Sequence, residues 1–191
     1  MRMARPIPWR HVASWSCLMC GKCCREYRVV LKPEEWLRLL ELYGPSVVEV
    51  GHGRFFLKRR PDGSCVFLMH VGDKWVCGLQ DMKPKACKLW PFKVVSYPKY
   101  GRPHEAYFEY MGRPLYVYVD PYCPGLSWGT PTPAFVAGTL VEAVEIALGI
   151  RTEQEHTTCK LPEGLRLYMM AKKRMGLRFP LGRRMWGRSA G

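Results

Sequence analysis

The sequence predicts a small α+β fold: a cysteine-rich, metal-stapled module with short strands and a helical, basic C-terminal part. Three observations support this. Short runs rich in Val, Phe, Tyr and Trp alternate with Gly and Pro, which is typical of strands joined by tight turns. Two longer stretches have the apolar spacing of helices. Nine cysteines occur in 191 residues, four of them within a run of eight positions.

The first helix is expected over residues 32–43. Pro33 suits the first turn, acidic residues follow it at the positive end of the helix dipole, and Gly44-Pro45 ends the helix. Apolar side chains at positions i, i+3, i+4 and i+7 give this helix one face toward a core. These side chains are Trp36, Leu39, Leu40 and Tyr43.

The rest of the chain predicts short strands followed by helices. The expected strands are Val47–Val50, Arg54–Lys58, Cys65–Met69, Trp75–Cys77, Lys93–Tyr97, Glu105–Met111 and Leu115–Val119. A helix of one or two turns, opened by Pro84, is expected over 82–90. Residues 121–133 hold four prolines and predict a loop. Residues 134–148 predict the longest helix, ended by Gly149, and a last helix is expected from Leu161 to about Met175.

The length fits one domain with an extension. We expect residues 1–130 to form a cysteine-cluster metal-binding domain, and residues 131–191 to form a helical basic extension packed on it. The chain has 30 Lys and Arg against 16 Asp and Glu, a net charge of +14. Residues 160–191 hold nine of the basic residues and one acid. This segment predicts contact with nucleic acid, an acidic protein or an anionic membrane surface. A docked helix followed by a solvated tail is the alternative.

The cysteines are expected to be metal ligands or redox groups. The N-terminus lacks the apolar run of a signal peptide, and the longest apolar stretch, residues 134–150, is too short and too charged to span a bilayer. We therefore expect a cytoplasmic protein without a transmembrane segment. Thiols stay reduced in that compartment, so the cysteines are not expected to form disulfides.

The most informative motif is the run of four cysteines at positions 17, 20, 23 and 24. Its repeated Cys-x-x-Cys spacing is typical of zinc sites and of iron–sulfur ligation, and Gly21 supplies the backbone freedom that such turns need. Cys23 and Cys24 are adjacent, so we expect them to point in different directions. The pair therefore favours two neighbouring metal sites or a polynuclear cluster. A redox pair of Cys17 and Cys20 is the alternative, but it leaves the other cysteines without a role.

Four blocks in order resemble the CxxCxxCC family of zinc- or iron-chelating proteins (YkgJ-like cysteine-cluster proteins). The blocks are Cys17-x-x-Cys20-Gly-x-Cys23-Cys24-Arg25, the Cys65/Cys77 pair, Lys83–Phe92 and Cys123-Pro-Gly125, and together they cover about residues 15–126. Lys83 and Lys88 stand where the family usually has Arg. The resemblance implies eight metal ligands. They are Cys17, Cys20, Cys23, Cys24, Cys65, Cys77, Cys87 and Cys123.

How the eight thiols divide stays open at this stage: two four-thiolate sites, one cubane cluster with a zinc, or one cluster with spare thiols. Cys159 lies outside the family pattern, and we expect it to be a packed or surface thiol and not a ligand. His70 lies between two of the cysteines but is expected on the surface. Aromatic residues flank the cysteines and are expected to shield a cluster from water, to form part of the core, or to do both. They are Trp15, Trp75, Trp90 and Phe92.

These features suggest three functions. The first is an iron–sulfur protein, with a 4Fe-4S cluster, zinc or both, that transfers electrons or supports a redox enzyme through a redox partner. The second is a zinc-stapled module that binds nucleic acid or another acidic partner. The third is a protein-modifying enzyme, because one relative with this motif is the flagellin lysine N-methylase. The sequence has no Gly-x-Ser-x-Gly elbow and no His-Glu-x-x-His helix, so it supports metal binding better than catalysis. Whether the chain is an enzyme, such as a component of an iron–sulfur oxidoreductase, stays open.

Overall fold

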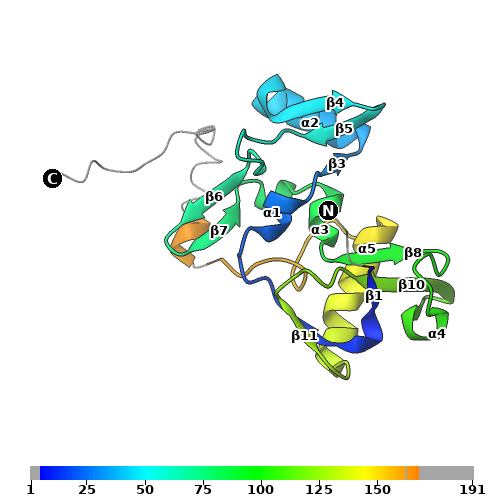
Figure 1. The fold of residues 1–191 in the computed structure, drawn as a ribbon. Helices are drawn as coiled ribbons and strands as arrows, with labels where there is room; N and C mark the ends of the chain where they lie inside the picture. The colour runs from blue at the N-terminus through cyan, green and yellow to red at the C-terminus, as the bar shows by residue number, and fades with distance from the viewer. Residues whose placement is uncertain (1–4, 162, 168–191) are drawn as a thin grey trace.

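The computed structural model describes residues 5–161 and 163–167, and its elements fall into three groups (Figure 1). The largest group contains a four-stranded antiparallel sheet centred on β10 (Arg113–Val119). β8 (Phe92–Val95) pairs with it so that Val94 lies opposite Val117. β9 (Tyr107–Tyr110) and β1 (Ile7–Pro8) also pair with β10. β-branched and aromatic residues fill these strands, as a half-buried pleated surface requires.

A helix covers this sheet and completes the first hydrophobic core. It begins with a π-helical segment, η4 (Phe135–Leu140), and continues as α5 (Val141–Leu148). It ends at Gly149, whose φ of +80° suits glycine. β2 (Val12–Trp15) and β11 (Leu126–Trp128) form a separate antiparallel pair beside it. The short elements η1 (Trp9–His11) and α4 (Pro103–Ala106) complete this group. The buried side chains include Val12, Trp15, Phe92, Val117, Leu140 and Val144.

The second core lies under α2 (Pro33–Tyr43) and a three-stranded sheet. The sheet has the order β3 (Val30–Leu31), β5 (Arg54–Leu57), β4 (Val48–Gly51), and η2 (Pro45–Val47) joins α2 to β4. Leu39 of α2 is 3% exposed. The expected helix and its apolar face are therefore confirmed: Trp36, Leu40 and Tyr43 pack against the same core.

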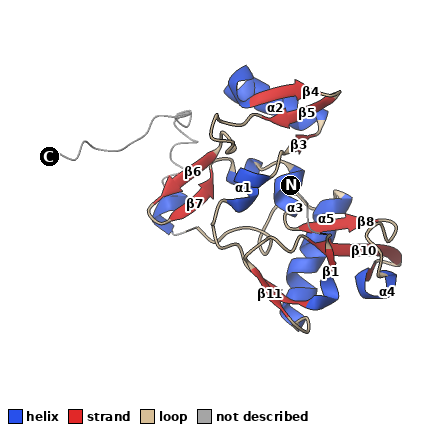
Figure 2. Cartoon of the chain, viewed as in Figure 1, coloured by secondary structure: helices blue, strands red, loops and turns tan. Residues whose placement is uncertain are grey.

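The third group is a hairpin of β6 (Leu68–Val71) and β7 (Lys74–Cys77). η3 (Gln80–Met82) and α3 (Lys85–Leu89) follow it in the chain. The short helix α1 (Lys22–Glu26) lies in the middle of the molecule, with the three groups around it (Figures 1 and 2). The motif of four cysteines is thus at the centre of the fold.

The predicted α+β class is confirmed, and the differences are local. The strand expected from Cys65 begins only at Leu68. The strand expected from Glu105 begins at Tyr107, because Pro103 opens a helical turn in front of it. β11 lies inside the segment expected to be only a loop. Residues 163–167 are helical, and the remainder of the expected last helix and of the basic segment lies outside the described residues. In the part of the chain that is described, none of the helices has the length and apolarity needed to cross a membrane.

Candidate metal centre

All nine cysteines line a single cavity of about 130 Å³, and every thiol is free. The cavity lies where the two hydrophobic cores meet. Cys17 and Cys123 pack against the first core. Four other cysteines pack against the second core: Cys24, Cys65, Cys77 and Cys87. The eight thiols predicted from the sequence are therefore brought together from four separate segments of the chain.

The cysteine motif is fixed to the hairpin by its backbone. Gly21 has a φ of +69°, and a Cβ there would lie only 2.9 Å from the Cβ of Trp75. The Trp75 amide donates a hydrogen bond to the Met19 carbonyl at 2.8 Å. The Cys65 amide likewise donates to the Cys24 carbonyl at 2.7 Å. The permissive role predicted for Gly21 fits this geometry, because any side chain would push the motif away from β7.

A second close approach brings Cys123 to the start of the motif. The Ser16 amide donates to the Gly125 carbonyl at 3.0 Å, and a Cβ at Gly125 would lie 2.0 Å from the Ser16 carbonyl oxygen. This position therefore accepts only glycine. Beside it, the Trp15 indole N–H donates to Cys123 Sγ at 3.3 Å. Such a bond favours the thiolate over the thiol.

Four cysteines share one backbone hydrogen-bonding pattern. In each, the sulfur accepts a bond from the amide two residues further along the chain. The pairs are Cys17 with Met19, Cys65 with Phe67, Cys77 with Leu79, and Cys123 with Gly125. Each bond acts to lower the pKa of its thiol. Amides aimed at sulfur before any ligand arrives are the outer-shell support that metal–thiolate sites use.

Burial opposes ionisation of these thiols. It raises the pKa of Cys65 to about 11, and it also raises the pKa of Cys77 and that of Cys87. The Lys83 ammonium acts in the opposite direction on the last two. Hydrogen bonding between the adjacent thiols lowers the pKa of Cys23 to about 7 and raises that of Cys24. Lys22 and Lys83 both line the cavity, and Arg60 also acts to lower the pKa of Cys65. A cavity of crowded thiols beside cations suits a bound metal, which deprotonates the thiols that coordinate it.

The positions of the Cys23 and Cys24 sulfurs correct one expectation. Cys23 and Cys24 were expected to point apart, but their Sγ atoms lie 3.9 Å from each other on α1. Tetrahedral zinc with Zn–S bonds of 2.3 Å places its sulfurs about 3.8 Å apart. Nevertheless, among residues 5–161 and 163–167, no group of three or more His, Cys, Asp or Glu side chains is arranged to hold a metal ion. The thiols surround a space instead of converging on one point.

Aromatic side chains enclose this space. Trp15, Trp75 and Trp90 line the cavity, and the Tyr27 ring lies 4.1 Å from that of Trp90. Phe92 packs behind Trp15, with the two rings edge-on and their centroids 5.6 Å apart. The cavity reaches the surface near Cys20, which is exposed, and Leu18, which is 49% exposed.

His70 lies where the sequence predicted, whereas Cys159 lies closer to the other cysteines than predicted. His70 is exposed, as expected, and its ring lies 4.2 Å from that of Trp75 at an interplanar angle of 35°, outside the cavity lining. Cys159 is packed, as one expectation had it, but it lines the cavity within hydrogen-bonding reach of Cys17. This bond lowers the pKa of Cys159 to about 6 and raises that of Cys17. Nothing in the local sequence around Cys159 indicates this position, which depends on a contact across more than a hundred residues.

A family model named CxxCxxCC, with the description "Putative zinc- or iron-chelating domain", matches residues 16–124. The chain belongs to the CxxCxxCC family. The matched CxxCxxCC region contains the eight predicted ligands and ends before Cys159. A search of the curated proteins and one of the solved structures found no match. The family supports metal binding in general, and the donor set fits it, because thiolates are ligands that zinc and iron–sulfur clusters both take.

Proposed function

We propose that the protein binds an iron–sulfur cluster in the cysteine cavity and transfers electrons. The observation that carries this proposal is the size of the space that the thiols surround. One buried water needs roughly 10–15 Å³ of cavity. A cavity of about 130 Å³ therefore has room for a group of several heavy atoms. In a cluster each iron takes its own cysteine, so the sulfurs are held apart by the inorganic core.

The surroundings of the cavity support redox chemistry. Backbone amides and the Trp15 indole donate hydrogen bonds to the cysteine sulfurs, and such bonds raise the potential of a cluster. Aromatic side chains limit the access of water. Exposure at Cys20 and Leu18 leaves one side of the cavity near the surface, where a redox partner could approach. A reducing compartment such as the cytoplasm would keep the nine thiols available.

A zinc-stapled scaffold is the second candidate, and the 3.9 Å separation of Cys23 and Cys24 favours it. Zinc would then hold the two cores together, and binding of nucleic acid or an acidic partner would fall to the basic C-terminal segment. Most of that segment lies outside the described residues, so this binding stays a prediction. The methylase-like activity also stays a prediction, which calorimetry with S-adenosylmethionine would test.

Anaerobic purification followed by metal analysis, sulfide analysis and visible spectroscopy decides between the two candidates. We expect iron with acid-labile sulfide, about four irons for each cubane cluster, and a visible band that bleaches on reduction. One or two zinc ions with no sulfide and no visible band would reject the cluster and favour the scaffold. A folded chain that binds neither metal would reject both.

A further inference from the structure

We propose that Cys159 is a ninth cysteine of the metal centre and completes a four-thiolate set with Cys17, Cys20 and Cys123. This inference rests on the proposed function, because it assigns a ligand to the same cavity. It goes beyond the matched family region, which ends at residue 124.

The position of Cys159 carries the first part of the argument. The residue is 9% exposed, lines the cavity, and lies within hydrogen-bonding reach of Cys17. The side chain of Gln80 is a further hydrogen-bonding partner of its thiol. Next to it, Thr158 accepts a hydrogen bond of 2.9 Å from the Lys83 ammonium. Lys83, whose charge acts on Cys23, Cys77 and Cys87, therefore also contacts the segment that contains Cys159.

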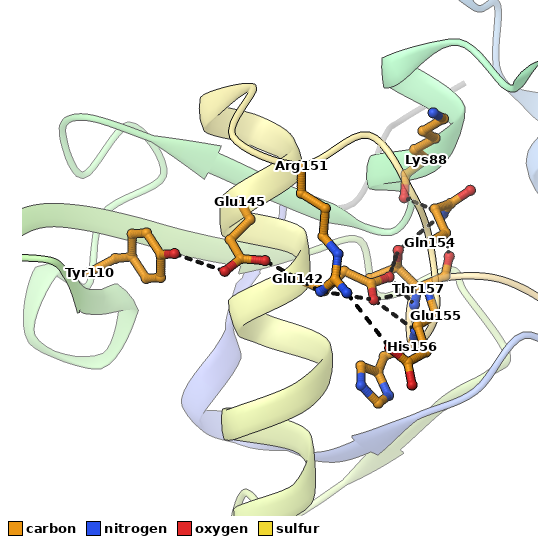
Figure 3. Close-up of polar contacts among 9 residues, drawn as sticks. All are labelled: Lys88, Tyr110, Glu142, Glu145, Arg151, Gln154, Glu155, His156 and Thr157. Atoms are coloured by element: carbon orange, nitrogen blue, oxygen red, sulfur yellow. Dashed lines mark hydrogen bonds and ion pairs between the residues drawn. The ribbon is translucent and has the colours of Figure 1, made fainter. Parts of the chain in front are cut away.

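The segment before Cys159 is held by a buried carboxylate (Figure 3). Glu142 of α5 is fully buried, and its carboxylate accepts four hydrogen bonds. The amides of Glu155 and His156 donate to Oε2, each at 2.9 Å. The amide and hydroxyl of Thr157 donate to Oε1 at 2.7 and 2.5 Å. A segment without regular structure thereby gains a fixed path that ends at the cavity.

We call the Glu142 carboxylate and the four hydrogen bonds that it accepts from residues 155–157 the Glu142 clamp. Neighbouring side chains reinforce it. Arg151 lies between the carboxylates of Glu142 and Glu145, with Nη1 to oxygen distances of 3.6 and 3.3 Å. Gln154 donates to the Lys88 carbonyl of α3 at 3.1 Å and to the Thr157 carbonyl at 2.7 Å. The segment is thus bonded to both α5 and α3, the helix that carries Cys87. This anchoring fixes the backbone that precedes Cys159 beside the cavity.

The distribution of the thiols carries the second part of the argument. Four thiols belong to the second core: Cys65 is part of it, and Cys24, Cys77 and Cys87 pack against it. At the first core lie Cys17 and Cys123, and Cys20 is close enough to act electrostatically on Cys123.

Cys23 lies between the two sets, since its charge acts on cysteines of both. Without Cys159 the first set has only three thiols of its own. With Cys159 both sets have the four ligands that a zinc ion or a cubane cluster takes.

Metal content of substituted chains tests the assignment. Cys159→Ser and Cys159→Ala, purified anaerobically and reconstituted with iron and sulfide or with Zn²⁺, should hold about half the metal of the wild-type chain. Thr152→Val is the matched control: it replaces an exposed hydroxyl that donates to the Glu153 carboxylate outside the cavity lining, keeps every thiol, and should keep the full metal content. Folded Cys159 variants with wild-type metal content and spectrum would overturn the assignment.

A second measurement covers the case in which the variants do not fold. The wild-type chain is treated with N-ethylmaleimide, with and without reconstituted metal, at a urea concentration that opens the metal-free cavity, and the modified cysteines are identified by mass spectrometry. We expect metal to protect Cys159 together with Cys17. Protection of Cys24 and Cys65 but not of Cys159 would refute the inference while leaving the proposed function intact. If metal protects none of the cysteines, the proposed function itself fails.

Discussion

Replacing Glu142 by Gln should release the segment that carries Cys159, although the two side chains have nearly the same shape. The carboxylate offers two acceptor oxygens, and each of them takes two hydrogen bonds. An amide keeps one oxygen and turns its NH₂ group toward two backbone or hydroxyl donors. Two donors inside the protein then lose their acceptor. The loss of negative charge also leaves Arg151 with one fewer partner.

The magnitude follows from the two orphaned donors. Each buried, unsatisfied polar group costs about 1–3 kcal/mol, so Glu142→Gln should destabilise the segment by about 2–6 kcal/mol. If the whole chain unfolds with the segment, the melting temperature should fall by roughly 5–20 °C. If the segment opens alone, the melting temperature changes little, but amide exchange at Glu155, His156 and Thr157 should accelerate.

Thermal unfolding and hydrogen exchange of the metal-free chain measure these effects, with Glu145→Gln as the control. Glu145 lies on the same helix and accepts a 2.8 Å hydrogen bond from Tyr110, but it is partly exposed. Its substitution should cost about 0.5–1.5 kcal/mol. The role of the Glu142 clamp would be refuted if both substitutions destabilised the chain equally, or if amide hydrogen exchange at residues 155–157 were unchanged in Glu142→Gln.

Three further predictions concern the pH dependence of the Glu142 contacts, the charge of Lys83 and the indole of Trp15. Burial opposes ionisation of Glu142, but the hydrogen bonds from Thr157, His156 and Glu155 outweigh it and hold its pKa below the usual range. The stabilisation is therefore present above about pH 4.3, the ordinary value for Glu, and lost as pH falls through the lower folded pKa. In denaturant titrations the difference between wild type and Glu142→Gln should shrink below about pH 4, and a constant difference would contradict this. Lys83→Met removes a positive charge from the cavity, so Cys23 of the metal-free chain should react with iodoacetamide at a higher pH midpoint than its pKa of about 7 indicates. Lys99→Met, whose ammonium lies over Tyr100, should leave that midpoint in place, and a shift in both variants would point to a global effect. Trp15→Phe removes the hydrogen bond to Cys123, so a bound cluster should stay in place but titrate at a more negative potential; an unchanged potential would show that the indole does not act on the cluster.

Local signals made part of the fold predictable. Pro33 and Gly44 mark the ends of α2 in the sequence, and the structure begins and ends this helix at the same places. That eight cysteines lie around one cavity was predicted from the resemblance to a family. The prediction depended on finding four motif blocks in the family's order along the chain. The pairing of β2 with β11 had no such signal, because it joins segments more than a hundred residues apart through few residues. Glu142 resembled an ordinary polar position of an apolar helix, since its partners are backbone amides, which no sequence pattern displays.

The meeting of two cores at one cavity has a consequence for the life of the protein in a cell. Each core is small, and a small core alone supports little stability. A ligand that binds thiols from both cores would make their unfolding a single event, whereas the metal-free chain can open at this junction. Because proteases cut opened chains, metal supply would set how long a newly made molecule survives.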